Sequence, residues 1–229
     1  MTIPYFGGSL VAYLPLKNAT RDSQAIIDAA AAVSPRAVLP KDIDSTLVAG
    51  YEAQASLTLD LYRSLHATVQ EVAWAGGNTV CVAMLKPLSR GTVTINSTDA
   101  TKPPAIDFRT FSHPIDFDVT IASLKKTREF MSSGPMRAIG AVEIVPGANI
   151  TSDADIEAAI RTFVTGTWQH PTSTCSMMPR ELGGVVDPQL QVYGVKGLRI
   201  VDASIMPMII GSHTSSTVYA VAEKVSFAS

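Results

Sequence analysis

The sequence predicts an α+β fold, and three observations support this prediction. The 229-residue chain has a positive mean hydropathy and 46% hydrophobic residues, so it carries enough apolar side chains for a sizeable core. Apolar residues recur at helical spacing in several long segments. In contrast, 79–85 is rich in β-forming residues and 92–96 alternates like a strand, with Pro87 and Gly91 bracketing the connection between them. Helices and short strands therefore share one chain.

Charge and hydropathy exclude two classes of partner. The net charge is −2 and the pI is near 6.1, without the basic patch that nucleic-acid binding requires. No run of about 18 apolar residues predicts a membrane span, and the first residues do not have the pattern of a signal peptide. We expect a small-molecule ligand rather than a nucleic acid or a membrane.

The N-terminal third is predicted to be mainly helical. A short apolar stretch at 9–16 precedes an alanine-rich helix at 22–33. A long helix is predicted at 47–72, because apolar residues follow one another at intervals of four: Leu57, Leu61, Leu65 and Val69. On this prediction, His66 lies on the flank of the helix.

Three further helices and one strand are predicted in the rest of the chain. The helices occupy 116–132, 155–163 and 217–227, and the last one is expected to face inward through Val218, Val221, Ala222 and Val225. Glycine, serine, threonine and proline are dense at 166–184, which indicates turns. The apolar run 198–201 is short and reads as a buried strand.

Two histidines lie in segments of small, turn-forming residues. His170 is in Thr167–Met177, and His213 is in Gly211–Thr217. Between them the predicted strand ends in Asp202. Because histidine titrates near neutral pH, two imidazoles that converge on one pocket could remove and return a substrate proton.

The cysteines and the glycosylation sequons constrain the function less than the two histidines do. Cys81 and Cys175 could form one disulfide, but nothing in their spacing requires it, and we expect two buried free thiols. They are too few to predict a metal site. Asn18, Asn96 and Asn149 each begin a glycosylation sequon, so the chain is compatible with a secreted glycoprotein.

The C-terminal pattern resembles the glucose–methanol–choline (GMC) family of flavin-dependent oxidoreductases, and within it fungal glucose oxidase and aryl-alcohol oxidase. The resemblance rests on ordered blocks: Trp168–Pro171, Thr174–Met177, Gly183–Asp187, Val192–Ser204, Ser212–His213 and Thr217–Lys224. Leu85–Gly91 and Pro104–Asp107 extend it toward the N-terminus.

The resemblance implies a fold and a partner. Residues 1–190 would form part of a substrate-binding domain, an antiparallel sheet with helices on one side. Residues 191–229 would supply the C-terminal strand and helix of a Rossmann-like FAD domain. The family binds FAD through a Gly-x-Gly-x-x-Gly turn, and this sequence has none. We therefore expect the C-terminal part of a larger flavoenzyme, whose partner is the missing N-terminal FAD-binding portion and which binds FAD poorly by itself.

The resemblance also implies catalytic roles. His170 would accept the hydroxyl proton of an alcohol while the carbon-bound hydrogen leaves as hydride to flavin N5. His213 would hydrogen-bond the same oxygen. We interpret His113, which precedes a helix in a His-Pro pair, as structural.

Five residues are implied in cofactor binding. Asp202 and Ala203 would lie beside the FAD ribityl and pyrophosphate, and Thr214 and Ser215 near the isoalloxazine. Gln169 would contact the flavin through its main chain. An alternative from the residues alone is that Asp202 only caps the turn that follows it.

The substrate is only partly constrained. Glucose oxidases carry an arginine and an asparagine where this chain has Gly166 and Trp168. A site without these two polar partners should not favour glucose, because sugar recognition depends on matching each hydroxyl, and Trp168 indicates a more apolar or aromatic alcohol. Two alternatives remain open: lyase or cyclase chemistry on the same scaffold by acid–base catalysis, and an inactive chain that needs a partner.

Overall fold

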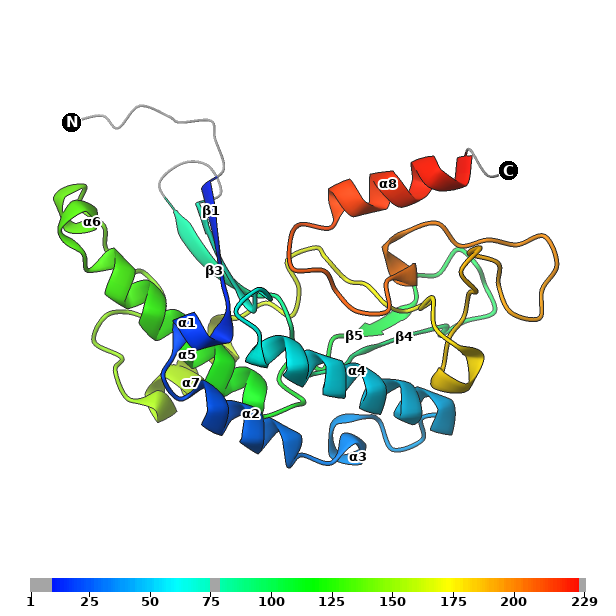
Figure 1. Cartoon of the computed structure of the whole chain (residues 1–229), viewed down its shortest axis with the longest axis horizontal. Coiled ribbons are helices and arrows are strands. Elements are labelled where there is room, and N and C mark those ends of the chain that lie inside the picture. Colours follow the sequence, from blue (N-terminus) through cyan, green and yellow to red (C-terminus); the bar gives the residue numbers. More distant parts are fainter. Residues whose placement is uncertain (1–9, 75–78, 227–229) are drawn as a thin grey trace. The chain divides into compact units, whose positions relative to one another are not determined.

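The computed structural model describes residues 10–74 and 79–226 (Figure 1). The chain divides into two compact units. Unit 1 contains the described parts of 1–30, 61–85 and 114–165, and unit 2 those of 31–60, 86–113 and 166–229. Each unit thus combines segments that are distant in sequence. The boundary predicted between residues 190 and 191 concerns the domains of a longer flavoenzyme and stays a prediction.

Unit 1 contains a three-stranded antiparallel sheet. Its strands are β1 (Leu10–Leu14), β2 (Gln70–Trp74) and β3 (Val80–Met84), in the order β1-β2-β3. The apolar stretch at 9–16 thus supplies an edge strand, with Ser9 outside the described residues. The strand predicted at 79–85 is confirmed as β3.

Several helices accompany this sheet in unit 1. They are α1 (Leu16–Ala19), α2 (Ser23–Ala31), α5 (Ile115–Met131), α6 (Gly134–Ala138) and α7 (Asp153–Phe163). Helix α5 contacts β3, and α1, α6 and α7 contact α5. Gln70, fully buried at the start of β2, donates its side-chain amide to Ser123 O at 3.1 Å and to Thr127 Oγ1 at 3.0 Å on α5. These bonds satisfy a polar group that burial would otherwise penalise.

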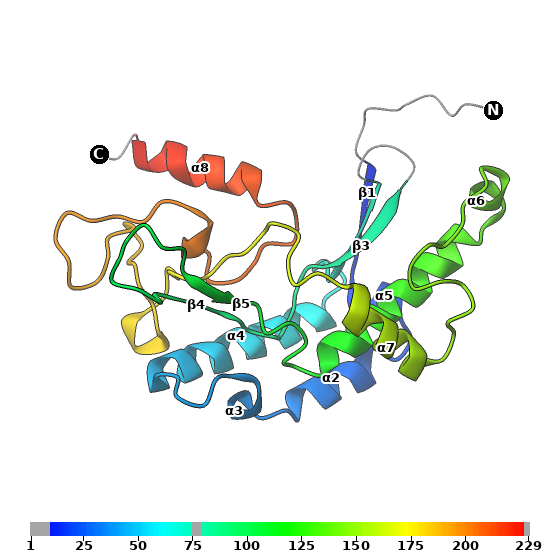
Figure 2. The ribbon, with the colours of Figure 1, turned by 180° about the vertical axis from the view of Figure 1, so that it is seen from behind.

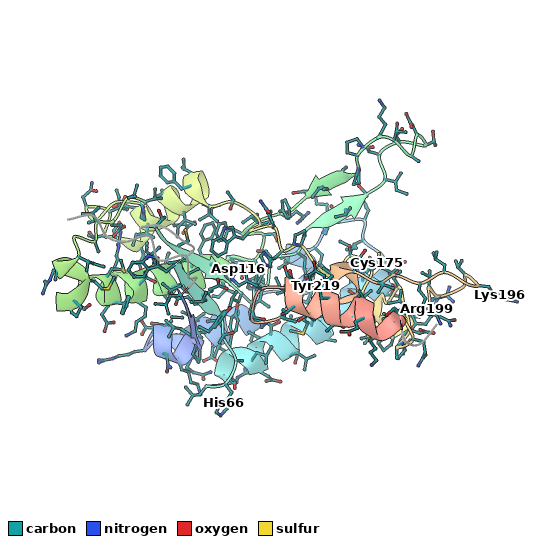
Figure 3. All side chains as sticks on the ribbon, turned by 90° about the horizontal axis from the view of Figure 1, so that it is seen from above. His66, Asp116, Cys175, Lys196, Arg199 and Tyr219 are labelled. Carbon is teal, nitrogen blue, oxygen red and sulfur yellow. The ribbon has the colours of Figure 1, made fainter. Side chains whose placement is uncertain are left out.

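The predictions for α2, α5 and α7 are confirmed, whereas the long helix at 47–72 is wrong at its C-terminal end. Helix α4 spans Ser45–Arg63, and the chain then bends before β2 begins. Leu57 and Leu65 are exposed, and the buried positions of α4 include Val48, Tyr51, Thr58 and Tyr62 instead. His66 lies in the bend, beyond the helix, rather than on its flank (Figure 3). The prediction failed because Leu65 and Val69 continue the four-residue apolar spacing beyond the end of the helix.

Unit 2 has less regular structure. It contains α3 (Pro35–Val38), most of α4, β4 (Thr92–Thr94), β5 (Ala105–Asp107), two 3-10 turns (Arg180–Leu182 and Ala203–Ile205) and α8 (Ser215–Ser226). Strands β4 and β5 pair antiparallel, which confirms the strand predicted at 92–96 over Thr92–Thr94 only. The buried face that its alternation indicates is wrong, because Val93 and Ile95 are exposed. One apolar cluster joins α3 to α4 through Val38, Leu39, Val48 and Tyr51.

A second apolar cluster lies beneath α8. Its buried members are Val186, Leu190 and Ile205, and Val221 and Val225 of α8 pack against it. Both ribbon views show α8 lying over the loops of this region (Figures 1 and 2). No residue of α8 is itself buried, and Ala222, which we expected to face inward, is exposed. The helix predicted at 217–227 is otherwise confirmed, with Phe227 outside the described residues.

The predicted strand at 198–201 is wrong for the described part of the chain. The region pairs only through isolated bridges, such as Gln191 with Arg199. A strand needs a continuous partner, and the neighbouring described residues provide single bridges. The α+β class itself is confirmed, since helices and two small antiparallel sheets coexist.

Three other features of the described residues bear on function. Cys81 and Cys175 are free thiols, as predicted, but both are half-buried rather than buried. Across 10–74 and 79–226, no group of three or more histidine, cysteine or acidic side chains is arranged to hold a metal ion. None of the helices in these ranges combines the length and hydropathy that crossing a bilayer requires.

Candidate functional site

The two histidines that the sequence singles out face each other within unit 2. His170 lies in the loop that follows α7, and His213 lies just before α8. Their ring centroids are 5.2 Å apart, with the ring planes at 65° in an edge-on arrangement. Trp168, two residues before His170, places its ring 6.2 Å from that of His213. The rings of Trp168, His170 and His213, which come from two segments distant in sequence, therefore lie close together.

Backbone hydrogen bonds hold the two histidine segments together. Cys175 N donates to Ser204 O at 3.0 Å, and Met177 N donates to Ile205 O at 2.8 Å. These bonds tie the strand-like stretch after His170 to the 3-10 turn that precedes the His213 loop. The density of small residues at 166–184, which predicts turns, allows this close approach of two irregular segments.

The hydrogen bonding of His170 fixes which of its nitrogens can act as a base. Nδ1 contacts the carbonyl oxygen of Trp168. Because a carbonyl can only accept, Nδ1 must be the donor, and in the neutral ring Nε2 is then the unprotonated nitrogen. His170 is half-buried and His213 is exposed, so the pair is accessible to a small molecule.

The turn that carries His170 contains strained backbone. Gln169 has φ +61° and Ser173 has φ +75°, in the left-handed region that non-glycine residues rarely adopt. His170 N donates to Thr167 Oγ1 at 3.3 Å, which closes the turn. Strain of this kind persists where surrounding contacts impose it, and it is frequent at functional sites.

Four of the five residues implied in cofactor binding lie at the two ends of the segment 202–215, and the fifth, Gln169, lies in the turn that carries His170. Asp202, which is exposed, accepts hydrogen bonds from Ser204 N at 2.8 Å and from Ser204 Oγ, so it does cap the 3-10 turn that begins at Ala203. Thr214 is buried, and its carbonyl accepts from Val218 N at the start of α8. The first amides of α8, from Ser215 onward, point out of the helix end without intrahelical acceptors.

These groups fit one edge of a flavin nucleotide. Helix-end amides suit carbonyl or phosphate oxygens, and an exposed carboxylate suits ribityl hydroxyls. The described residues offer no glycine-rich turn for the pyrophosphate. The fit is therefore to part of FAD.

A small residue is required at Gly166. A Cβ added there would lie 2.5 Å from Thr110 Oγ1 and 3.0 Å from Phe108 Cβ. Phe108 and Trp168 are each about two-fifths exposed. The position that carries arginine in glucose oxidases is thus closed by packing in this chain.

Two residues near the site were not predicted from the sequence. Gln54 of α4 donates to Pro207 O at 2.6 Å, and Lys86 Nζ donates to Ile209 O at 2.6 Å, both in the loop that leads to His213. Burial lowers the pKa of Lys86 to about 8. No local motif marks Gln54, and Lys86 was recognised only as part of the block Leu85–Gly91.

Comparison with known proteins identifies the family. A profile of the GMC oxidoreductase family matches residues 87–222. Dehydrogenase xptC of Emericella nidulans is 39% identical over 215 residues, which cover 93% of this chain and 35% of that protein. An FAD-dependent oxidoreductase from Chaetomium thermophilum superposes with a TM-score of 0.89 at 38% identity, over 94% of this chain and 37% of its own.

A fungal aryl-alcohol oxidase superposes with a TM-score of 0.87 at 36% identity, again over 94% of this chain and 37% of that one. The chain spans roughly a third of the length of these relatives. The ordered sequence blocks, the histidine pair and these similarities agree, and the chain belongs to the GMC oxidoreductase family.

Proposed function

We propose that this chain is the C-terminal part of an FAD-dependent oxidoreductase that oxidises a primary or secondary alcohol. The observation that carries the proposal is the pair of imidazoles with centroids 5.2 Å apart, in which Nδ1 of His170 contacts the Trp168 carbonyl and Nε2 is the nitrogen left for a substrate proton. An alcohol hydroxyl is too weak an acid to ionise without such a base.

His170 accepts the hydroxyl proton at Nε2, while the bond from Nδ1 to the Trp168 carbonyl holds its ring and tautomer. His213 donates a hydrogen bond to the same oxygen, which favours the developing negative charge. FAD, when bound, supplies the hydride acceptor at N5. The edge-on geometry lets one substrate oxygen lie within reach of both rings.

Asp202, Ala203, Thr214 and Ser215 would hold one edge of FAD, and the main chain of Gln169 would contact its ring system. The N-terminal FAD-binding portion of the longer enzyme would hold the pyrophosphate. Two observations support this division: the relatives are about three times longer than the chain, and α8 presents its surface to solvent, with Tyr219 79% exposed (Figure 3).

We infer an apolar or aromatic alcohol as substrate. Trp168, whose ring lies 6.2 Å from that of His213, is partly exposed. Phe108 is also partly exposed, and it packs against Gly166, two residues before Trp168. Stacking on such rings recognises aromatic groups. A sugar would find no replacement for the arginine, because packing closes position 166.

The test uses the longer enzyme that contains this chain, with FAD bound, mixed anaerobically with benzyl alcohol or with glucose. We expect benzyl alcohol to bleach the visible flavin band, and His170→Ala to slow bleaching by about 10²–10⁴-fold. His66→Ala, a histidine in the bend after α4, is the matched control and should leave the rate unchanged.

Three results would contradict the proposal. If His170→Ala slowed flavin bleaching by less than about tenfold, His170 could not be the catalytic base. Faster bleaching by glucose would contradict the substrate class. Bound flavin that no alcohol reduces would favour the lyase or cyclase alternative.

A further inference from the structure

The loop that carries His213 is an irregular segment with anchors at both ends. Met206 N donates to Ala203 O at its start, and Val218 N donates to Thr214 O where α8 begins. Pro207, which lies between these anchors, has no N–H with which to form a backbone bond. Side chains that bond to the carbonyls of this loop can therefore help to hold the His213 ring in place.

Gln54 contacts both histidine segments with one amide group. Its Nε2 donates to Pro207 O at 2.6 Å, and it lies 3.3 Å from the Sδ of Met178. Met178 follows Met177, which is bonded to Ile205 O. One side chain of α4 thus spans the stretch after His170 and the loop before His213.

Gly50 lets the stretch 178–182 approach α4 closely, near Gln54. Gly50, one turn before Gln54, lets the carbonyl of Leu182 approach so closely that a Cβ would lie 2.1 Å from its oxygen. The stretch 178–182 therefore rests directly on the helix backbone, and a rigid helix positions the Gln54 amide.

Lys86 makes an equivalent contact two residues further along the loop. This lysine is 7% exposed, and its Nζ lies 2.6 Å from Ile209 O. A buried ammonium group is costly unless it is hydrogen-bonded, and bonds to a charged donor are stronger than neutral ones. The segment that carries Lys86 is itself bonded to α4, since Tyr51 of α4 donates to Leu88 O at 2.9 Å.

We propose that Gln54 and Lys86 are positioning residues, which hold the 206–213 loop through the carbonyls of Pro207 and Ile209 and so keep the His213 ring facing His170. Neither touches the reacting atoms. The catalytic meaning of this role rests on the proposed function, but the geometric role does not.

The test is nuclear magnetic resonance of the 229-residue chain labelled at its four histidines. In the unmodified protein, ring protons of His170 and His213 should give a nuclear Overhauser cross-peak. Gln54→Glu replaces the donor by an oxygen that repels Pro207 O, and Lys86→Met removes the other donor. We expect each change to reduce the cross-peak at least twofold and to shift the His213 resonances, with those of His66 and His113 unchanged.

Two variants serve as matched controls. Lys86→Arg restores a charged donor and should recover much of the cross-peak. Gln24→Glu makes the same chemical change at an exposed residue of α2, where Gln24 donates to Asp28 at 2.8 Å, and should leave the cross-peak intact. If Gln54→Glu does not fold by circular dichroism, Gln54→Met replaces it, because it keeps the length without a donor.

Unchanged cross-peaks in both donor-removing variants would overturn the proposal. Unfolding of every such variant would also overturn it, because the donors would then serve general stability. The measurement needs neither FAD nor turnover, so a failure of alcohol oxidation would leave its result valid, and an altered cross-peak would not by itself establish the reaction.

Discussion

Replacing Gly50 by alanine sets two effects of opposite sign against each other. In the interior of a helix, alanine is favoured over glycine by about 1 kcal/mol. In this structure the added methyl would lie 2.1 Å from Leu182 O and 3.1 Å from Leu182 C, well inside the 3.0 Å limit of real Cβ contacts for the oxygen. Both atoms are backbone and cannot rotate away.

Overpacking of this kind costs about 1 to 3 kcal/mol, and the upper end applies when the obstacle is a carbonyl. We therefore expect Gly50→Ala to lower the free energy of unfolding by about 1 to 2 kcal/mol, after the helix-propensity gain of about 1 kcal/mol is included. The assay is urea denaturation followed by far-ultraviolet circular dichroism.

Gly134 of α6 is the matched control. A Cβ at this position would meet nothing within 4 Å. Gly134→Ala should thus stabilise the protein by about 0.5 kcal/mol, less than in a helix interior because Gly134 begins its helix. If Gly50→Ala stabilised the protein as Gly134→Ala does, the 178–182 stretch could not rest on α4 as described.

Three further changes have expected outcomes in the same denaturation assay. Burial lowers the pKa of Lys86 from 10.5 to about 8. Between these pH values the unfolded state binds one more proton than the folded state, so the free energy of unfolding rises with pH. The pKa shift corresponds to about 3 kcal/mol, which solvent contact reduces, so the unmodified protein should gain about 1 to 2 kcal/mol relative to Lys86→Met between about pH 7.5 and 10.5; a fall in this difference would contradict the reasoning. Gln169→Gly should raise the free energy of unfolding by about 0.5 to 1 kcal/mol by relieving its φ of +61°, whereas a loss would show that its side chain stabilises the turn. Glu143→Gln should cost about 2 kcal/mol, because its largely buried carboxylate accepts from Arg128 at 2.9 and 2.7 Å, while Glu157→Gln in an exposed pair should cost under about 0.5 kcal/mol; equal costs would refute the importance of burial.

Local patterns in the sequence predict much of the helical structure. Helices α5 and α7 follow from apolar periodicity and from acidic residues in the first turn, and Ser152 caps α7 by accepting from Asp155 N at 3.1 Å. The C-terminal end of α4 could not be predicted, because Leu65 and Val69 continue its apolar spacing. Only the pairing of β2 with β3 and with β1, which is distant in sequence, ends the helical pattern.

Some residues of the candidate site could be predicted from the sequence, and others could not. His170 and His213 could be predicted as a pair because family-like blocks surround both. Gln54 and Lys86 could not, because their partners in the His213 loop are 153 and 123 residues away in sequence, and a single hydrogen bond across that separation leaves no local pattern. The expected strand at 198–201 shows the opposite error, since an apolar run reveals burial without revealing a pairing partner.

The central claim is that the imidazoles of His170 and His213 face each other. A nuclear Overhauser spectrum of the histidine-labelled, unmodified chain tests it most directly. With ring centroids 5.2 Å apart, we predict a cross-peak between ring protons of the two residues, which disappears in His213→Gln. Strong cross-peaks from each ring to its own loop, with none between the two rings, would contradict the account.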